Sequence, residues 1–135
     1  MQSIHVELQT AEWDCGVQCY RAALASRGID CSHEQAVGEL CATKQDGTSD
    51  YALVRALGNR DMHALSYGFD AWLSANPSRE PLQMSLLCVE DGAHWILALA
   101  RVGSDVIIAF DPEVGLGVYS LAQLRKECVC ILSGF

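Results

Sequence analysis

Four residues spaced along the chain carry the side chains that acyl transfer by a thiol requires. Gln9 stands six residues before Cys15, and His94 and Asp111 follow in that order. A thiolate attacks a carbonyl carbon, an imidazole moves the proton, a carboxylate orients the imidazole, and an amide NH2 donates to the oxyanion. The sequence therefore predicts Cys15 as nucleophile, His94 as general base, Asp111 as its orienting group and Gln9 as oxyanion donor.

Each of the four residues also has an ordinary structural interpretation. A cysteine is most often buried in a core, a lone glutamine or histidine most often has no special role, and Asp111 could simply begin a turn before Pro112. The spacing favours the catalytic interpretation. If residues 94–101 and 105–111 pair as antiparallel strands, the ends that carry His94 and Asp111 meet, and the carboxylate can bind one ring nitrogen.

The residues beside Cys15 indicate how its thiol is activated. Apolar residues recur with helical spacing after Cys15, which places the thiol at a helix N terminus, where unpaired NH groups favour a thiolate. Gly16 either lets the backbone approach a substrate closely or permits a tight turn. Asp14 would oppose a thiolate if it pointed inward, so we expect it to face away as a helix cap.

The composition limits the fold and the location of the protein. A chain of 135 residues suffices for one domain with its own core, and we expect residues 1–135 to form a single domain. The longest apolar runs, 95–100 and 106–110, are far shorter than the roughly 18 residues that cross a bilayer. The first 15 residues contain no Lys or Arg, so we expect no signal peptide and a cytoplasmic location.

Charge and cysteine content exclude several classes of function. The formal net charge is −8 without any basic cluster, so nucleic acid and anionic membranes are poor partners. The 7 cysteines are an odd number without the spacing of a disulfide framework, and we expect most to be reduced and buried. No C-x2-C pair occurs, which argues against a metal or another cofactor. His5, His33 and His63 have no evident partner and are expected to be structural or exposed.

Apolar periodicity predicts helices in the first half of the chain and strands in the second. Gly28 should terminate the first helix, Ser32 should cap the next, and Thr48 or Ser49 a third. Turn residues at Asp91-Gly92 and 102–104 separate short apolar runs, which indicates antiparallel hairpins. The pattern predicts an α+β fold with a cleft between its two parts. The expected helices cover 15–27, 32–41, 51–57 and 121–126, the expected strands 84–89, 95–100, 106–110, 118–120 and 128–132, and the most exposed loop 74–81.

Taken together, these motifs resemble the C39 family of papain-fold cysteine peptidases, the double-glycine leader peptidases of bacteriocin processing and export. The resemblance implies a papain-like fold with an N-terminal helical half packed on a C-terminal antiparallel sheet. It also implies the same roles for Cys15, His94, Asp111 and Gln9. The shared features, in chain order, are Gln9, Asp14-Cys15-Gly16 with Cys19, Asp46-Gly47-Thr48-Ser49 followed by Leu53, Gly92-Ala93-His94-Trp95, and Asp111-Pro112 with Gly115.

The resemblance further implies a substrate cleft narrowed by bulky groups. Trp13 and Trp95 each adjoin a proposed site residue and, with Gly16, are candidate substrate-binding residues. A narrow cleft would admit residues without side chains, so Gly-Gly or Gly-Ala should be cleaved and bulkier pairs refused. The ordinary alternative is that both indoles pack in the core.

Three functions fit this resemblance to different degrees. Most family members form the front of an ATP-driven exporter, whereas this sequence contains neither membrane spans nor a phosphate-binding loop, so it resembles the standalone or C39-like members. We expect a thiol peptidase that cleaves a small peptide or protein, with a Gly-Gly leader as one candidate and an exporter as one candidate partner. An alternative is a C39-like toxin or effector, secreted without a signal peptide and paired with an immunity or chaperone protein, that cleaves or deamidates a target protein. A binding module is disfavoured, because it has no need of all four site residues.

Overall fold

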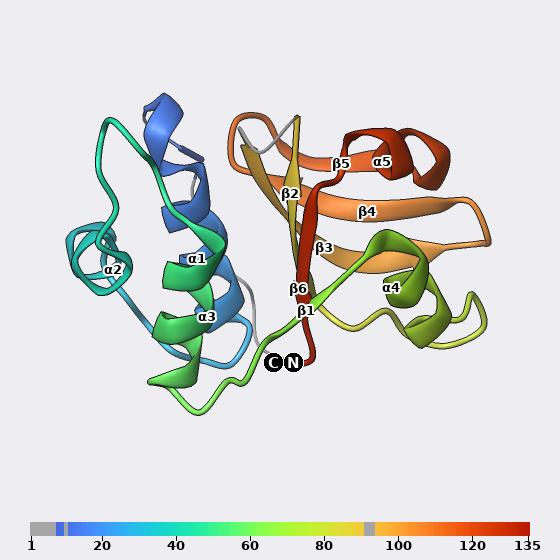
Figure 1. The fold of residues 1–135 in the computed structure, drawn as a ribbon, viewed down its shortest axis with the longest axis horizontal. Coiled ribbons are helices and arrows are strands. Elements are labelled where there is room, and N and C mark those ends of the chain that lie inside the picture. The colour runs from blue at the N-terminus through green and yellow to red at the C-terminus, as the bar shows by residue number, and fades with distance from the viewer. Residues whose placement is uncertain (1–7, 10, 91–93) are drawn as a thin grey trace.

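The structure, a computed structural model, describes residues 8, 9, 11–90 and 94–135. Within these residues, a helical part lies beside an antiparallel sheet of six strands (Figure 1). This arrangement confirms the predicted α+β fold with a helical half packed on an antiparallel sheet. The helical part comprises the short 3-10 helix η1 (Glu12–Asp14), α1 (Cys15–Ala25), α2 (His33–Leu40) and α3 (Asp50–Gly58). The sheet part comprises β1 (Leu65–Tyr67), α4 (Phe69–Ala75), β2 (Ser85–Val89), β3 (His94–Val102), β4 (Val106–Asp111), β5 (Gly115–Ser120), α5 (Leu121–Glu127) and β6 (Cys130–Ser133).

Local sequence explains where the first three α-helices begin and end. The Ser32 hydroxyl accepts a hydrogen bond from the Gln35 backbone NH and caps α2, and Ser49 caps α3 through the Ala52 NH. After α1, Gly28 adopts a φ of 73°, a left-handed conformation that favours glycine. The predicted caps and terminator are therefore confirmed. No helix among the described residues is long and apolar enough to cross a membrane.

The sheet has the strand order β1-β6-β2-β3-β4-β5, and all its neighbouring strands are antiparallel. Val89 of β2 pairs with His94 of β3, and Val102 of β3 pairs with Val106 of β4, so these strands form consecutive hairpins as predicted. The predicted turn at Asp91-Gly92 lies outside the described residues. β3 is thus an interior strand whose first residue, His94, stands between the ends of two neighbours.

The sequence does not predict β1 or α4, and β5 begins earlier than expected, at Gly115. α4 also includes Ser74 and Ala75, which the sequence pattern places in an exposed loop. One side chain anchors α4, because Trp72 is fully buried and its Nε1 donates to Ser85 Oγ at 2.9 Å. A single buried indole produces no helical periodicity, which is why the pattern misses this helix.

Apolar side chains cover both faces of the sheet. On one face Trp95 and Leu97 of β3 belong to the core shared with α1, α2 and α3. On the other face Ile96 and Ala98 pack in a second core with Trp72 of α4 and with α5. Successive residues of a strand point to opposite faces, so the apolar run of β3 contributes to both cores. β3 therefore connects the helical part to the rest of the sheet.

The cysteines are free thiols that lie in the core and at the surface. Four of the seven, Cys15, Cys19, Cys31 and Cys88, are buried, whereas Cys41 is exposed. Burial keeps most of these sulfurs out of contact with solvent, so burial does not distinguish Cys15 from the others. Its position as the first residue of α1 does.

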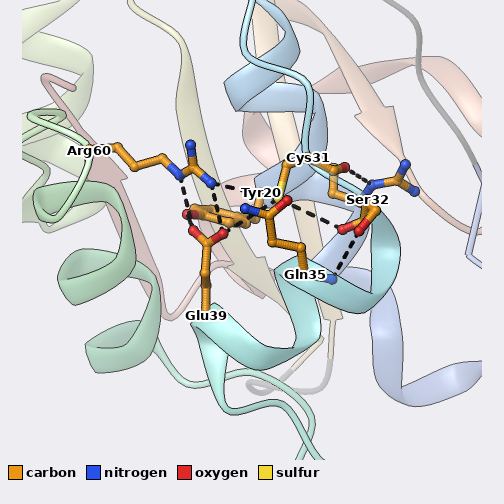
Figure 2. Close-up of polar contacts among 7 residues, drawn as sticks. Tyr20, Cys31, Ser32, Gln35, Glu39 and Arg60 are labelled. Atoms are coloured by element: carbon orange, nitrogen blue, oxygen red, sulfur yellow. Dashed lines mark hydrogen bonds and ion pairs between the residues drawn. The ribbon is translucent and has the colours of Figure 1, made fainter.

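A polar cluster joins α1, α2 and the residues after α3, and Figure 2 shows Glu39 at its centre. Glu39 Oε1 accepts from the Tyr20 hydroxyl at 2.6 Å, and its two oxygens accept from Nε and Nη2 of Arg60 at 3.0 and 2.7 Å. The hydrogen bonds from Arg60, against the opposing effect of burial, lower the pKa of Glu39 below its ordinary value. Glu39 is therefore an ionised acceptor shared by two donors from different elements.

Replacing Glu39 with Ala should destabilise the protein by about 1 to 2 kcal/mol, because Tyr20 and Arg60 lose a half-buried acceptor. Urea unfolding followed by circular dichroism measures the difference, and Gln35→Ala on the same helix is the control. The pKa of Glu39 is lowered below the ordinary glutamate value of 4.5. The loss of stability in Glu39→Ala should therefore be present above pH 4.5 and disappear as the pH falls through the lowered pKa. A difference independent of pH would contradict an ionised Glu39.

Candidate active site

Cys15 is the first residue of α1, directly after the short helix η1. Its side chain is buried, and α1 packs against β3. The thiol thus lies at a helix N terminus, where backbone NH groups lack partners within the helix. This is the placement that the sequence predicts for Cys15.

His94 and Asp111 come together because β3 and β4 are antiparallel neighbours. His94 is the first residue of β3 and Asp111 is the last residue of β4. Because Leu97 pairs with Phe110, the start of β3 lies beside the end of β4. His94 Nε2 lies 2.7 Å from Asp111 Oδ1. Both side chains are largely buried, with 8% and 15% of their surfaces exposed. The two side chains therefore form a close pair at the rim of the sheet.

Cys15 and His94 are in contact across the boundary between the helical part and the sheet. The Cys15 side chain lies close enough to the His94 imidazole to interact with it. Because Nε2 binds Asp111, the other ring nitrogen, Nδ1, is the one that remains for Cys15. The interaction with Cys15, opposed by desolvation and supported by Asp111, raises the pKa of His94 to about 9. The structure thus brings Cys15, His94 and Asp111 together in series.

Trp95, the residue after His94, is bonded to the helical part at two points. Its indole Nε1 donates to the Thr48 carbonyl at 3.0 Å, and its own carbonyl accepts from the Cys19 thiol at 3.4 Å. Burial raises the pKa of Cys19 well above its ordinary value, so this thiol stays protonated and donates. The bond with Cys19 holds the start of β3 against α1, and the bond with Thr48 holds it against the loop before α3. They therefore constrain the distance between Cys15 and His94.

Gly16 completes this connection, because Thr48 packs directly against its backbone. A Cβ atom added to Gly16 would lie 2.6 Å from Thr48 Cβ, closer than side-chain carbons approach one another. Gly16 is therefore needed for close packing of the loop at Thr48 on α1. A direct contact of Gly16 with substrate stays a prediction.

A pocket of about 340 Å³ opens between the helical part and the sheet. The loop 46–50 forms one wall, and the neighbouring ends of β2, β3 and β6 form the other. Its lining residues are Asp46, Thr48, Ser49, Asp50, Cys88, Trp95, Val129 and Cys130. Trp95 is both a packed residue and part of this wall, whereas Trp13 packs edge-on against His33, with ring centroids 6.3 Å apart. A pocket between the two parts is thus present beside Trp95, and its lining does not include Cys15, His94 or Asp111.

Gln9 lies beside the end of β4. Its backbone NH donates to the Pro112 carbonyl at 2.6 Å, and its side-chain Nε2 donates to the Ala11 carbonyl at 2.9 Å. Gln9 Oε1 is buried without a hydrogen-bond partner. An amide nitrogen carries two hydrogens, so the bond to Ala11 uses one of them. The position of Gln9 next to Pro112 ties the segment before Cys15 to the strand that ends in Asp111.

Asp14 and His33 form a pair that the sequence does not reveal. Asp14 is fully buried, its Oδ1 accepts from the Ala11 NH at 3.3 Å, and its Oδ2 lies 3.0 Å from His33 Nε2. It occupies the N-cap position of α1 without a side-chain capping bond. The expectation that His33 has no partner is therefore wrong. Asp14 and His33 each stand where a helix begins, but only packing of α1 on α2 brings those helix ends together.

One group of side chains in the described part of the chain has the spacing of metal ligands. His94, Asp111 and Glu113 offer ligand atoms within 4.8 Å of one another. His94 and Asp111 already bind each other, and the Glu113 backbone NH donates to Asp111 Oδ1 at 2.9 Å. Protein hydrogen bonds therefore account for this arrangement, and we assign no metal to it.

Gly16→Ala should destabilise the protein by about 1 to 3 kcal/mol, because the new methyl group forces α1 away from Thr48. Gly38→Ala is the matched control. It also lies in a helix, and an added Cβ there meets nothing within 4 Å, so it should stabilise by about 0.5 to 1 kcal/mol. Urea unfolding of both variants tests this. Equal changes in the free energy of unfolding of the two variants would show that Thr48 does not pack tightly on Gly16.

Comparison with known proteins places the chain in a family. The sequence model of the peptidase C39 family matches residues 3–129. No curated protein sequence matches the chain. The family match spans nearly the whole length of the protein, including the positions of Cys15, His94 and Asp111.

Solved structures show the same fold at low sequence identity. A double glycine motif protease from an AMS/PCAT transporter, solved in complex with the leader peptide, has a TM-score of 0.79 at 16% identity, covering 98% of this chain and 93% of that chain. The peptidase domain of Streptococcus ComA, a bi-functional ABC transporter involved in quorum sensing, has a TM-score of 0.78 at 16% identity, with 98% and 100% covered. The peptidase domain of Streptococcus mutans ComA has a TM-score of 0.63 at 18% identity, with 97% and 98% covered.

The family match and the fold agree with each other. The helical half and antiparallel sheet of this chain match the first two of these structures over nearly their whole length, with TM-scores of 0.79 and 0.78. The protein therefore belongs to the peptidase C39 family and is a cysteine peptidase of papain-like fold.

Proposed function

We propose that this protein hydrolyses a peptide bond with Cys15 as nucleophile, His94 as general base and acid, and Asp111 as the group that orients the imidazole. The observation that carries the proposal is the continuous contact of the three side chains. Cys15 interacts with His94, and His94 Nε2 lies 2.7 Å from Asp111 Oδ1. A thiol, an imidazole and a carboxylate in series are the groups that activate sulfur for acyl transfer.

The reaction divides into two proton-coupled steps. In the first step the Cys15 thiolate, whose proton is held by the His94 imidazolium, bonds to the carbonyl carbon, and the imidazolium gives its proton to the leaving amine as the C–N bond breaks. In the second step the neutral His94 takes a proton from water, the hydroxide bonds to the thioester carbon, and sulfur leaves as the thiolate beside the imidazolium. Asp111 holds the ring orientation and compensates the positive charge in both steps.

Gln9 is the proposed side-chain donor to the oxyanion. The negative oxygen of each tetrahedral intermediate needs hydrogen-bond donors, and the Gln9 amide nitrogen retains a second hydrogen after its bond to Ala11. The bond of the Gln9 backbone to Pro112 anchors this side chain next to the strand that carries Asp111. The backbone NH of Cys15, at the start of α1, is the proposed second donor.

We propose a peptide with small residues at the cleavage site as the substrate. The likeness to a double glycine motif protease bound to a leader peptide supports this class. Trp95, the loop 46–50 and the pocket between them would line the cleft, with Trp13 and Gly16 at its helical side. The free thiols are compatible with action in the cytoplasm, where thiols stay reduced, on a peptide destined for an exporter.

Wild-type protein under reducing conditions should cleave a leader peptide ending in Gly-Gly, should cleave a Gly-Ala variant, and should leave a Leu-Leu variant intact. Cys15→Ala should abolish cleavage, because no other thiol contacts His94 in the proposed mechanism. Gln9→Ala should lower kcat by about 10²- to 10³-fold, the usual effect of removing one oxyanion donor. Mass spectrometry of the products identifies the bond that is cut.

The controls separate chemistry from folding and peptidase from deamidase. Cys41→Ala removes an exposed thiol and Gln35→Ala an exposed amide, and both should leave kcat unchanged. The same incubations include a panel of glutamine-containing proteins, in which deamidation adds about one dalton. Deamidation without peptide cleavage would overturn the peptidase proposal in favour of a toxin-like activity. An unchanged rate in Gln9→Ala would assign the oxyanion to other donors.

The activity should decline as the pH rises through about 9. The interaction with Cys15, supported by Asp111, raises the pKa of His94 to about 9, so the imidazolium is present below that pH and lost above it. Asp111→Ala should move the alkaline limb of kcat/KM to lower pH by on the order of one unit. Asp105→Ala, which removes an exposed carboxylate at the other end of β4, is the control. An alkaline limb unmoved by Asp111→Ala would contradict the pairing.

A further inference from the structure

Both oxygens of the Asp111 carboxylate have protein partners. Oδ1 binds His94 Nε2 at 2.7 Å and accepts from the Glu113 backbone NH at 2.9 Å. Oδ2 accepts from the Tyr119 hydroxyl at 3.2 Å. The carboxylate is thus held by hydrogen bonds at both oxygens. Tyr119 is the side chain that binds Oδ2, the oxygen that His94 does not contact.

Tyr119 reaches Asp111 from a distant position on β5. Asp111 pairs with Gly115, so Tyr119 stands four residues further along the edge strand and on the same face. Its ring must therefore lie along the strand, across Gly117. A Cβ added to Gly117 would lie 3.2 Å from Tyr119 Cε2 and 3.5 Å from its hydroxyl oxygen, which shows how closely the ring covers this residue. The missing side chain at Gly117 leaves the space that the ring occupies.

Packing fixes the ring in this position. Tyr119 is half-buried and packs against the core on the outer face of the sheet, which Ile107 and Ala109 of the neighbouring strand help to form. Burial, followed by the charge of Asp111, raises the pKa of Tyr119 to about 12. The hydroxyl therefore keeps its proton at every pH where the enzyme would work. It can act only as a donor toward the carboxylate.

We infer that Tyr119 is a positioning residue, which holds the Asp111 carboxylate in the orientation that presents Oδ1 to His94. The inference rests on the proposed function, because it assigns Tyr119 a part in activating Cys15. A carboxylate rotates easily about its last torsion. The Glu113 NH and His94 both bind Oδ1, so the Tyr119 hydroxyl is the contact that restrains Oδ2. Loss of that contact would let the carboxylate turn and weaken its hold on the imidazole.

Tyr119→Phe tests this inference, because it removes the hydroxyl and keeps the ring. The first readout is the rate constant for alkylation of Cys15 by iodoacetamide near pH 6, mapped by mass spectrometry, which needs no knowledge of the substrate. It is measured in wild type, Tyr119→Phe, Asp111→Ala and the double variant. Tyr51→Phe, which removes an exposed hydroxyl on α3, is the matched control. Melting temperatures show that all variants are folded.

A positioning role predicts a specific pattern in these rates. Tyr119→Phe should slow alkylation of Cys15 by about threefold to tenfold, the rate equivalent of one ordinary hydrogen bond. It should have no further effect once Asp111 is Ala, because the two residues act through the same contact. On a cleaved peptide, kcat should fall by a similar factor with KM unchanged, since Tyr119 touches no substrate in this arrangement.

Two results would overturn the inference. One is an alkylation rate in Tyr119→Phe equal to that of wild type and Tyr51→Phe. The other is an equal loss in the presence and absence of Asp111, which would show that Tyr119 acts through general packing instead. A wild-type protein that alkylates rapidly at Cys15 but cleaves no peptide would overturn the proposed function alone, and the double-variant comparison would still decide the role of Tyr119.

Discussion

The contact between α1 and the start of β3 is the constraint on which the rest of the structure depends. The nucleophilic position and the imidazole belong to different parts of the fold, so neither local helix formation nor local strand pairing sets their separation. The bonds of Trp95 to Thr48 and Cys19, together with the close packing of Thr48 on Gly16, do so. Gly16 and Trp95 adjoin Cys15 and His94 in sequence, and Cys19 lies one helical turn from Cys15. A small shift at this contact would therefore move the two reacting groups directly.

A second set of polar contacts runs from this boundary to the edge of the sheet. Cys15 interacts with His94, His94 hydrogen-bonds Asp111, and Asp111 accepts from Tyr119; these residues are contributed in turn by α1, β3, β4 and β5. Antiparallel pairing aligns the three strands, so each residue of the series is positioned by the backbone hydrogen bonds of its neighbours. Rigid elements position side chains more precisely than loops do. The site is thus supported by the most regular part of the fold.

Much of the candidate site could be predicted from the sequence, because its residues stand at the ends of regular elements. The antiparallel pairing of β3 and β4 follows from two apolar runs around a turn, and it brings His94 to Asp111 without knowledge of the rest of the fold. The part played by Thr48 could not be predicted, because it depends on a loop packing against a distant helix. Tyr119 left a weak signal in the alternation of Gly115, Gly117 and Tyr119, which predicts a strand face but not the direction of the ring. β1 and α4 were missed because each is short and α4 depends on the single anchor Trp72.

The sequence by itself determined the order of elements, the helix caps and the residues that could do the chemistry, because these depend on local periodicity and on side-chain type. The family followed from the same residues and is confirmed by the match over residues 3–129. Only the tertiary structure decided which residues touch: that Asp14 binds His33, that Trp95 binds Thr48, and that Tyr119 binds Asp111. The physical reason is that these contacts join elements far apart in the chain. Their geometry is set by how the helical part packs on the sheet, and local sequence carries no record of that packing.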